Sequence, residues 1–162
     1  MTTVYRIGYC DTPAPTLNVL LMSLGYGSTQ GNGRWHTKGP NQVVYCGSSR
    51  ALCQLEKRVH TPMRPPRDLV AVEAIVPAAA VASAEGVVLP DDWDADNVDW
   101  SVGSAASQCI GDDWLARGTS LLLRVPSVVV PVGWNYLLNP AHPDARRVRT
   151  RRIEYRPDAR LW

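Results

Sequence analysis

An arginine, a tyrosine and a glutamate follow one another within a short stretch of this 162-residue chain. Arg34 lies in the motif Gly33-Arg34-Trp35-His36, Tyr45 ends the apolar run Val43-Val44-Tyr45, and Glu56 lies in the segment that follows. Each residue belongs to a different local element, and the three are close enough in sequence to converge on one cleft. Such a cleft would offer a cation, a hydroxyl and a carboxylate, and the guanidinium has the planar paired donors that fit a phosphate.

The element expected to carry Glu56 is a helix. Residues 50–60 have helical spacing, and Ser49 before them is a candidate N-cap. The apolar positions are predicted to form one arc of this helix: Ala51, Leu52, Leu55 and Val59. Glu56 would lie at the edge of that arc, where a carboxylate costs free energy unless a cation or a hydroxyl partners it. This position favours a functional glutamate over an exposed helical one.

Two later stretches add polar groups inside apolar surroundings. Ser127 follows the run Leu123-Arg124-Val125-Pro126, and the segment 135–143 contains Asn135, Asn139 and His142. A serine after proline can also serve only to bond the local backbone, and amides before proline usually build turns. We therefore interpret the last three residues first as structural support.

Together these stretches resemble the RES domain, which is named for an arginine, a glutamate and a serine and occurs in bacterial toxins encoded beside Xre-type antitoxins. The resemblance extends from Tyr5-Arg6-Ile7 to Arg160-Leu161-Trp162, and several separate motifs match in order. It implies one α+β domain over residues 1–162, related to ADP-ribosyltransferases. In that fold two small packed β-sheets, flanked by short helices, surround an NAD-binding cleft.

The resemblance also implies a reaction, cleavage of NAD at the nicotinamide–ribose bond, with NAD as substrate and no prosthetic group. Glu56 is expected to hold ribose hydroxyls and stabilise the cationic ribose, and Arg34 to grip the pyrophosphate. Tyr45 would stack on or hydrogen-bond to the ligand, and Ser127 would hydrogen-bond to ribose or nicotinamide.

Two weaker candidates complete the predicted NAD site. Arg6 matches an early arginine of the family pattern and is expected to make a second phosphate contact or a salt bridge. His36 is either a general base or a packed, hydrogen-bonded structural residue beside Trp35.

The acceptor of ADP-ribose is left open by the sequence. The leading hypothesis is a toxin that depletes NAD by transfer to water or phosphate, and the alternative is an ADP-ribosyltransferase that modifies a protein target. A non-catalytic interaction module and a cysteine hydrolase built on Cys46 or Cys53 with His36 are the competing classes. The expected partner is an Xre-type antitoxin, whose helix-turn-helix part would make any DNA contact.

Composition sets limits on other functions. The formal net charge is only +2, although arginines crowd the C-terminal end and aspartates crowd residues 91–99. Both runs are interpreted as solvated surface. The alternative for the arginines is that they bind an acidic partner surface or a phosphate-bearing ligand. The four cysteines have no paired CxxC spacing, so no zinc site is predicted. Neither a signal peptide nor a membrane-spanning segment is expected, which favours the cytoplasm.

The remaining elements follow from hydrophobic pattern and breakers. Strands are predicted at residues 3–9, 43–45, 69–76, 120–132 with an interruption at Pro126, and 148–155. Further helices are predicted at residues 17–24 and within 101–117, ending near Gly118, and the glycine-rich segment 25–33 is predicted to be a mobile loop beside the site. Strands separated by short helices without a regular βαβ rhythm indicate an α+β domain.

Overall fold

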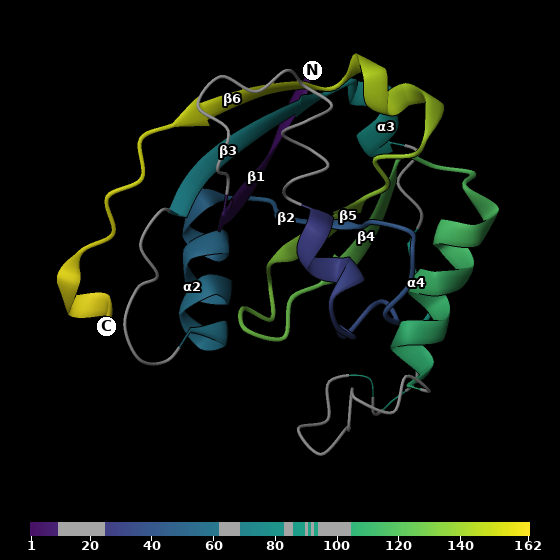
Figure 1. Cartoon of the computed structure of the whole chain (residues 1–162), viewed down its shortest axis with the longest axis horizontal. Coiled ribbons are helices and arrows are strands. Elements are labelled where there is room, and N and C mark those ends of the chain that lie inside the picture. Colours follow the sequence, from purple (N-terminus) through teal and green to yellow (C-terminus); the bar gives the residue numbers. More distant parts are fainter. Residues whose placement is uncertain (10–24, 62–68, 83–85, 90, 92, 94–104) are drawn as a thin grey trace.

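The computed structural model describes residues 1–9, 25–61, 69–82, 86–89, 91, 93 and 105–162. Its strands form a six-stranded antiparallel sheet in the order β4-β5-β2-β1-β3-β6 (Figure 1). The strands are β1 (Thr2–Tyr9), β2 (Val44–Gly47), β3 (Leu69–Val76), β4 (Leu122–Pro126), β5 (Trp134–Leu138) and β6 (Arg149–Ile153). The helices are α2 (Arg50–His60), α3 (Ala78–Ala82) and α4 (Ala106–Arg117), with 3-10 turns η1 (Tyr26–Thr29), η3 (Pro143–Arg147) and η4 (Ala159–Leu161). The predicted α+β class is confirmed.

The two small sheets expected from the family resemblance are joined into one sheet at a narrow junction. β1 pairs with β3 along its whole length, whereas its described register with β2 is the single pair Tyr5 and Gly47. At this junction α2 passes close to the sheet, because a Cβ at Gly47 would lie 2.8 Å from the sulfur of Cys53. The halves β4–β5–β2 and β1–β3–β6 therefore form one continuous sheet, with a single described residue pair at their junction.

Helix α2 begins and ends where the sequence predicts, and Ser49 caps it by accepting a hydrogen bond from the Leu52 amide over 3.1 Å. The predicted apolar arc is wrong, because Leu55 and Val59 are 43% and 58% exposed. The buried residues of α2 are Leu52 and Cys53. The helix thus turns a different face to the sheet, and Glu56 lies close to that face.

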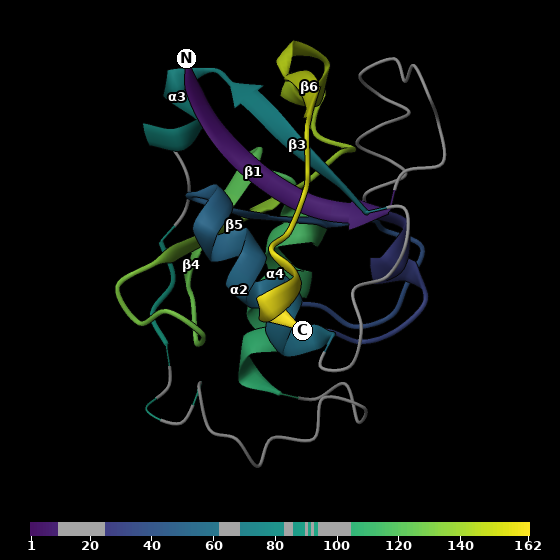
Figure 2. The same ribbon diagram turned by 90° about the vertical axis from the view of Figure 1, so that its left-hand side faces the viewer.

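The C-terminal segment runs beside α2 (Figure 2). The Tyr155 hydroxyl donates to Gln54 Oε1 over 2.6 Å, and the Trp162 indole N–H donates to the Thr61 carbonyl over 2.8 Å. These contacts reach across about a hundred residues and attach the middle and the C-terminal end of α2 to the end of the chain.

A buried carboxylate on β3 joins three elements. Glu73 is 5% exposed, and its Oε1 accepts from Arg50 of α2 over 2.7 Å. Its Oε2 accepts from Arg151 of β6, with the Nε contact at 2.8 Å. These hydrogen bonds, above all those from Arg151, outweigh burial and hold the pKa of Glu73 below its ordinary value. The pairing fixes the edge strand β6 and the start of α2 on β3.

The remaining predicted segments are a long strand, a glycine-rich segment and two helices. The strand expected over 120–132 is shorter, since β4 ends at Pro126 and a turn leads into β5, a strand that the sequence interpretation missed. The segment 25–33 contains η1, whose Ser28 is buried and accepts from the Val43 amide, so it is packed against the strand. Helix α4 ends at Gly118 as predicted, with φ of 57° at that glycine. The helix expected over 17–24 lies outside the described residues.

None of the helices in the described part of the chain combines the length and apolar character that a membrane crossing requires.

Candidate functional site

Glu56 is held by two hydrogen-bond donors from the β4–β5 hairpin. Ser127 Oγ donates to Glu56 Oε1 over 2.8 Å, and Asn135 Nδ2 donates to the same oxygen over 2.7 Å. Ser127 is 1% exposed, while the Glu56 side chain keeps 24% of its surface. The other oxygen, Oε2, lies 4.0 Å from Nε2 of the exposed His60. One carboxylate oxygen is therefore fixed by the protein, and the second points to a partly open region.

The turn that carries Ser127 is held by two hydrogen bonds of its own. The Ser127 amide donates to the Gly133 carbonyl, and Ser127 Oγ accepts from the Val130 amide, both over 3.0 Å. The serine therefore bonds the local backbone, as one interpretation of the sequence expected, and also bonds Glu56. Its position is set by the hairpin, so its contact positions the carboxylate of α2.

Tyr45 and His36 form a second, more deeply packed group. The Tyr45 hydroxyl lies 2.7 Å from His36 Nδ1, and the Trp35 amide donates to this hydroxyl over 3.3 Å. His36 Nε2 lies 3.0 Å from the carbonyls of Ser28 and Gly31, so this nitrogen must carry the proton. We therefore assign the hydroxyl as donor to an unprotonated Nδ1.

The electrostatics of this pair agree with the assignment. Burial lowers the pKa of His36, and burial raises the pKa of Tyr45 against the opposing charges of Arg6 and Arg34. Both ring nitrogens of His36 are engaged and the residue is 4% exposed. The geometry thus matches the structural alternative for His36 better than a general base.

Arg34 lies at the tip of a tight hairpin formed by the bridge between Gly33 and His36. Its Nη1 donates to the Trp93 carbonyl over 2.9 Å, and the side chain is half-buried. Trp35 beside it is 3% exposed and packs 5.8 Å from the ring of Trp93. The buried tryptophan anchors the hairpin, and the neighbouring arginine remains partly accessible.

Arg6 of β1 contacts the backbone of the second group. Its Nη1 donates to the Tyr45 carbonyl over 2.9 Å, and its buried Nε has no hydrogen-bond partner. Burial, followed by the charge of Arg6, lowers the pKa of Lys57, which neighbours Glu56 on α2. Two cations therefore lie within electrostatic reach of each other close to the carboxylate, an arrangement that suits a bound anion.

Tyr45 and Asn135 lie on one face of the sheet. Tyr45 pairs with Leu137, and Asn135 lies two residues along β5, so their side chains project from the same side. The hydrogen bonds place the predicted residues in two groups: Glu56 with Ser127, and Tyr45 with His36 and, through its carbonyl, Arg6. Arg34 bonds the Trp93 carbonyl instead.

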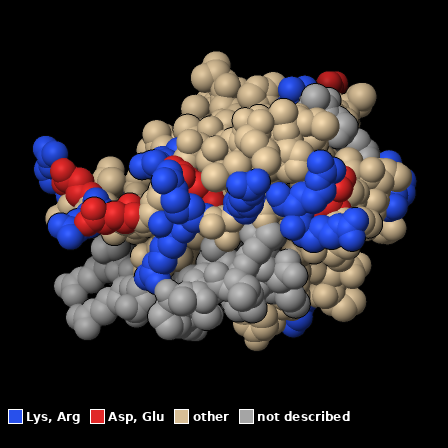
Figure 3. All heavy atoms as spheres, turned by 90° about the horizontal axis from the view of Figure 1, so that it is seen from above, with Lys and Arg blue, Asp and Glu red and all other residues tan. Residues whose placement is uncertain are grey.

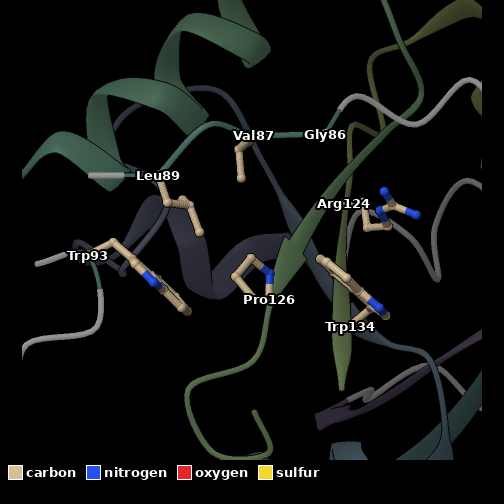
Figure 4. A pocket seen from close by; sticks show the side chains of 7 residues that line it. All are labelled: Gly86, Val87, Leu89, Trp93, Arg124, Pro126 and Trp134. Carbon is tan, nitrogen blue, oxygen red and sulfur yellow. The ribbon is translucent and has the colours of Figure 1, made fainter. Parts of the chain in front are cut away.

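An apolar hollow of about 300 Å³ adjoins these groups at the outer edge of β4 (Figure 4). Trp93 and Trp134 face it from opposite sides, with Pro126 between them. Arg124 lies over the Trp134 ring at 4.7 Å from its centre. Pro126 directly precedes Ser127, and the Trp93 carbonyl binds Arg34, so the hollow continues the walls of the site.

Cys46 and Cys53 do not form the thiol–imidazole pair of a cysteine hydrolase with His36. Burial raises the pKa of the Cys46 thiol to about 12 and that of Cys53 to about 11. Cys53 donates its thiol hydrogen to the Tyr5 carbonyl, and both nitrogens of His36 are occupied. Both thiols therefore stay protonated near neutral pH, and packing is the better explanation of Cys53.

The C-terminal arginines are partly neutralised on the surface seen in Figure 3, where basic and acidic side chains alternate. Four of them form ion pairs: Arg147 with Asp144, Arg151 with Glu73, Arg156 with Glu154 and Arg160 with Asp158. Except at Glu73 the acids are exposed, so these pairs add little stability. The arrangement supports a solvated surface over a concentrated anion site.

Asn135 is interpreted from the sequence as structural support, and the structure places it in a strand rather than in a turn. Asn139 and His142 do build turns, by accepting from the amides of Ala141 and Asp144. Asn135 instead lies in β5 and binds Glu56. The signal was present, because Trp134-Asn135-Tyr136 after Gly133 has the aromatic content of a strand in which alternate residues share a face.

Comparisons with known proteins show the family of this chain. A family model described as the RES domain matches residues 3–160. Prs ADP-ribosylating toxin from Sphingobium sp. (strain YBL2) is 39% identical over 133 residues, which cover 80% of this chain and 79% of the relative. Toxin Res from Pseudomonas putida (strain KT2440) is 31% identical over 138 residues, covering 85% of this chain and 91% of the relative.

A solved structure shares the fold. It is the MbcT–MbcA toxin–antitoxin complex of M. tuberculosis, in which the matched chain has a TM-score of 0.56 and 16% sequence identity. The match covers 94% of this chain and 84% of that one.

Proposed function

The chain belongs to the RES-domain family, and we propose on this premise that it is the toxin of a bacterial toxin–antitoxin pair that cleaves NAD at the nicotinamide–ribose bond. The observation that carries the proposal is the Glu56 carboxylate, whose Oε1 is fixed by Ser127 and Asn135 while its side chain keeps 24% of its surface exposed. A fixed anion beside a partly open site is what a cationic ribose transition state requires.

In the proposed reaction the bond between the ribose carbon and the nicotinamide nitrogen breaks. Its electron pair stays with nitrogen, so nicotinamide leaves as a neutral molecule and the ribose carbon becomes cationic. Glu56 Oε2 stabilises this charge and holds a ribose hydroxyl. An oxygen of water or phosphate then forms the new bond to that carbon, and water gives up a proton as it does so.

The cations around the site support binding of the pyrophosphate. Arg34 is half-buried at its hairpin tip, and Arg6 has a buried Nε without a hydrogen-bond partner. An unpaired buried N–H is costly, and a phosphate oxygen would satisfy it. Lys57, the next residue on α2 after Glu56, adds a third positive charge within electrostatic reach of Arg6. Tyr45 acts here as a neutral wall, since its hydroxyl is committed to His36.

A second candidate is ADP-ribosylation of a protein target, favoured by the name of the Sphingobium relative, Prs ADP-ribosylating toxin. The same glycosidic cleavage serves both, and only the acceptor differs. The proposed partner is an antitoxin of the Xre type with a helix-turn-helix part. The shared fold with a chain of the MbcT–MbcA toxin–antitoxin complex supports an antitoxin as partner. We place the reaction in the cytoplasm, where NAD is abundant.

The test is incubation of purified protein with NAD, alone, with phosphate and with cell lysate, followed by mass spectrometry of the products. Free ADP-ribose indicates hydrolysis, ADP-ribose 1″-phosphate indicates phosphorolysis, and a lysate protein that gains ADP-ribose indicates transfer. Intact NAD in all three mixtures would contradict the proposal and favour an interaction module.

Glu56→Gln keeps an oxygen for Ser127 and Asn135 to bind but removes the charge, so NAD consumption is expected to fall by roughly 100-fold or more. The matched control is Glu154→Gln, an exposed glutamate paired with Arg156, which should leave the rate unchanged. Arg34→Lys should raise the KM for NAD, because the paired donors are lost while the charge is kept. A Glu56→Gln variant with the wild-type rate would remove Glu56 from the mechanism.

A further inference from the structure

The hairpin that carries Arg34 is held from outside by a helix. Its own bridge is short, with the Gly33 amide 3.0 Å from the His36 carbonyl and the reverse contact at 3.5 Å. A Cβ at Gly33 would lie 2.6 Å from the His36 ring and 2.9 Å from the Tyr45 hydroxyl. The hairpin is therefore tightly fitted on its inner side.

Helix α4 contacts the outer side of this hairpin at three positions. Gln108 Nε2 donates to the Gly33 carbonyl over 2.9 Å, and the Trp35 carbonyl lies directly against Gly111. Asp112 accepts the Thr37 amide on Oδ1 over 2.9 Å and the Thr37 hydroxyl on Oδ2 over 2.6 Å. These helix positions are spaced i, i+3 and i+4, so they form one face of α4.

Gln108 is placed to act as a rigid link. It is fully buried, and its Oε1 accepts the Ala105 amide at the start of the helix over 3.1 Å. Both ends of its amide group are therefore used, one on α4 itself and one on the hairpin. Contacts to the backbone of residues 33, 35 and 37 bracket Arg34 without involving its side chain.

We propose that Gln108 and Asp112 are positioning residues that fix where the Arg34 guanidinium meets the substrate, acting through the backbone of Gly33 and Thr37. The proposal rests on the proposed function for the role of Arg34. We call the contacts of Gln108 and Asp112 with the hairpin backbone the clamp. A misplacement of about 1 Å in a binding group can lower the rate on the order of 100-fold, so the clamp has a large effect on activity. Simple packing of α4 would instead affect stability alone.

A double-mutant cycle separates the two roles. Gln108→Met keeps the length of the side chain and removes both its donor to Gly33 and its acceptor for the Ala105 amide, and kcat/KM for NAD is expected to fall roughly 10- to 100-fold, mainly through KM. In an Arg34→Lys background, which lacks the paired donors, the same change should cost less than about 3-fold. Equal losses in both backgrounds, or a wild-type kcat/KM in Gln108→Met, would overturn the proposal.

Two further variants keep the test decisive. Thr37→Val removes only the hydroxyl contact to Asp112 and should reproduce a smaller KM effect if Gln108→Met does not fold. Asp113→Asn changes a neighbouring exposed residue of α4 that pairs with Arg117, and it should leave kcat/KM unchanged.

Amide hydrogen exchange tests the clamp independently of NAD cleavage. Exchange at residues 33–37 should accelerate in Gln108→Met by roughly 10-fold or more while the amides of β3 remain protected. Unchanged exchange would refute the clamp even in an active toxin. Faster exchange in a protein that leaves NAD intact would retain the clamp and refute the proposed function.

Discussion

Replacing Gly111 with alanine is expected to push α4 away from the Arg34 hairpin. A Cβ at this position would lie 1.7 Å from the Trp35 carbonyl oxygen and 2.8 Å from its carbon, distances that no side chain tolerates. The obstacle is backbone that is itself anchored by the buried Trp35 ring, so no flexible side chain can move aside. Helix and hairpin must separate by roughly 1 Å or more.

The expected cost follows from opposing effects. Overpacking against rigid backbone costs about 3 kcal/mol, the upper end of the usual range, and the better helix propensity of alanine returns about 1 kcal/mol. The net loss of about 2 kcal/mol corresponds to a fall in Tm of roughly 4 to 8 °C for a chain of this size. Because Arg34 moves with the hairpin, NAD consumption measured well below the new Tm should fall by about 100-fold.

Calorimetry and a coupled NAD assay on the same preparations check both numbers. The matched control is Gly31→Ala, because a Cβ at Gly31 meets no atom within 4 Å and its φ is not in the left-handed region. Gly31→Ala should keep the Tm within about 2 °C of the wild type, as surface substitutions usually do. A Gly111→Ala protein with wild-type Tm and rate would refute the packing of α4 against the hairpin.

Three more outcomes are expected. Glu73→Gln should lower the free energy of unfolding at pH 7 by about 1 to 3 kcal/mol in urea titrations, because two arginines lose their carboxylate. Since the folded pKa of Glu73 is below its ordinary 4.5, this stability is present above pH 4.5 and is lost as the pH falls through the folded pKa. A difference between variant and wild type that stays constant down to pH 2 would contradict this prediction. Because the folded pKa of His36 lies below 6.5, the unfolded chain binds a proton at a higher pH than the folded protein does. Tm should therefore be constant above pH 6.5 and decrease as the pH is lowered from 6.5, with a weaker decrease in His36→Gln. Identical decreases in both proteins would argue against the neutral buried imidazole. Asn135→Ala removes one of the two donors to Glu56 Oε1 and should lower kcat by roughly 10-fold, and an unchanged kcat would show that Ser127 alone suffices.

Local patterns predicted most elements of this fold because their signals lie within each segment. Helix α2 has both a cap at Ser49 and helical spacing, and β3 is apolar at every position except Glu73, so the predicted ranges 50–60 and 69–76 match the structure. The end of α4 at Gly118 was equally local, since a left-handed residue there terminates the helix. The strand β5 was missed because asparagines and prolines further along the same stretch pointed to turns.

The exposed face of α2 shows where local pattern fails. Leu52, Leu55 and Val59 satisfy helical spacing, yet two of the three are largely exposed. The face that turns inward is chosen by long-range contacts: Cys53 bonds the Tyr5 carbonyl, and Gly47 leaves room for its sulfur. No pattern within the helix records those partners, which lie on β1 and β2.

The same distinction explains the site. Arg34, Tyr45 and Glu56 were predicted from residue type and family resemblance, and the contacts of Asn135 and Gln108 were not, because each binds a partner distant in sequence. Gln108 meets the Gly33 carbonyl across 75 residues, and Asn135 meets Glu56 across 79. The groups that would touch substrate can be named from the sequence, whereas the groups that hold them in place require the fold. It follows that a variant survey confined to the arginine, glutamate and serine of the family name would not test the two helix residues, Gln108 and Asp112, on which the position of the arginine depends.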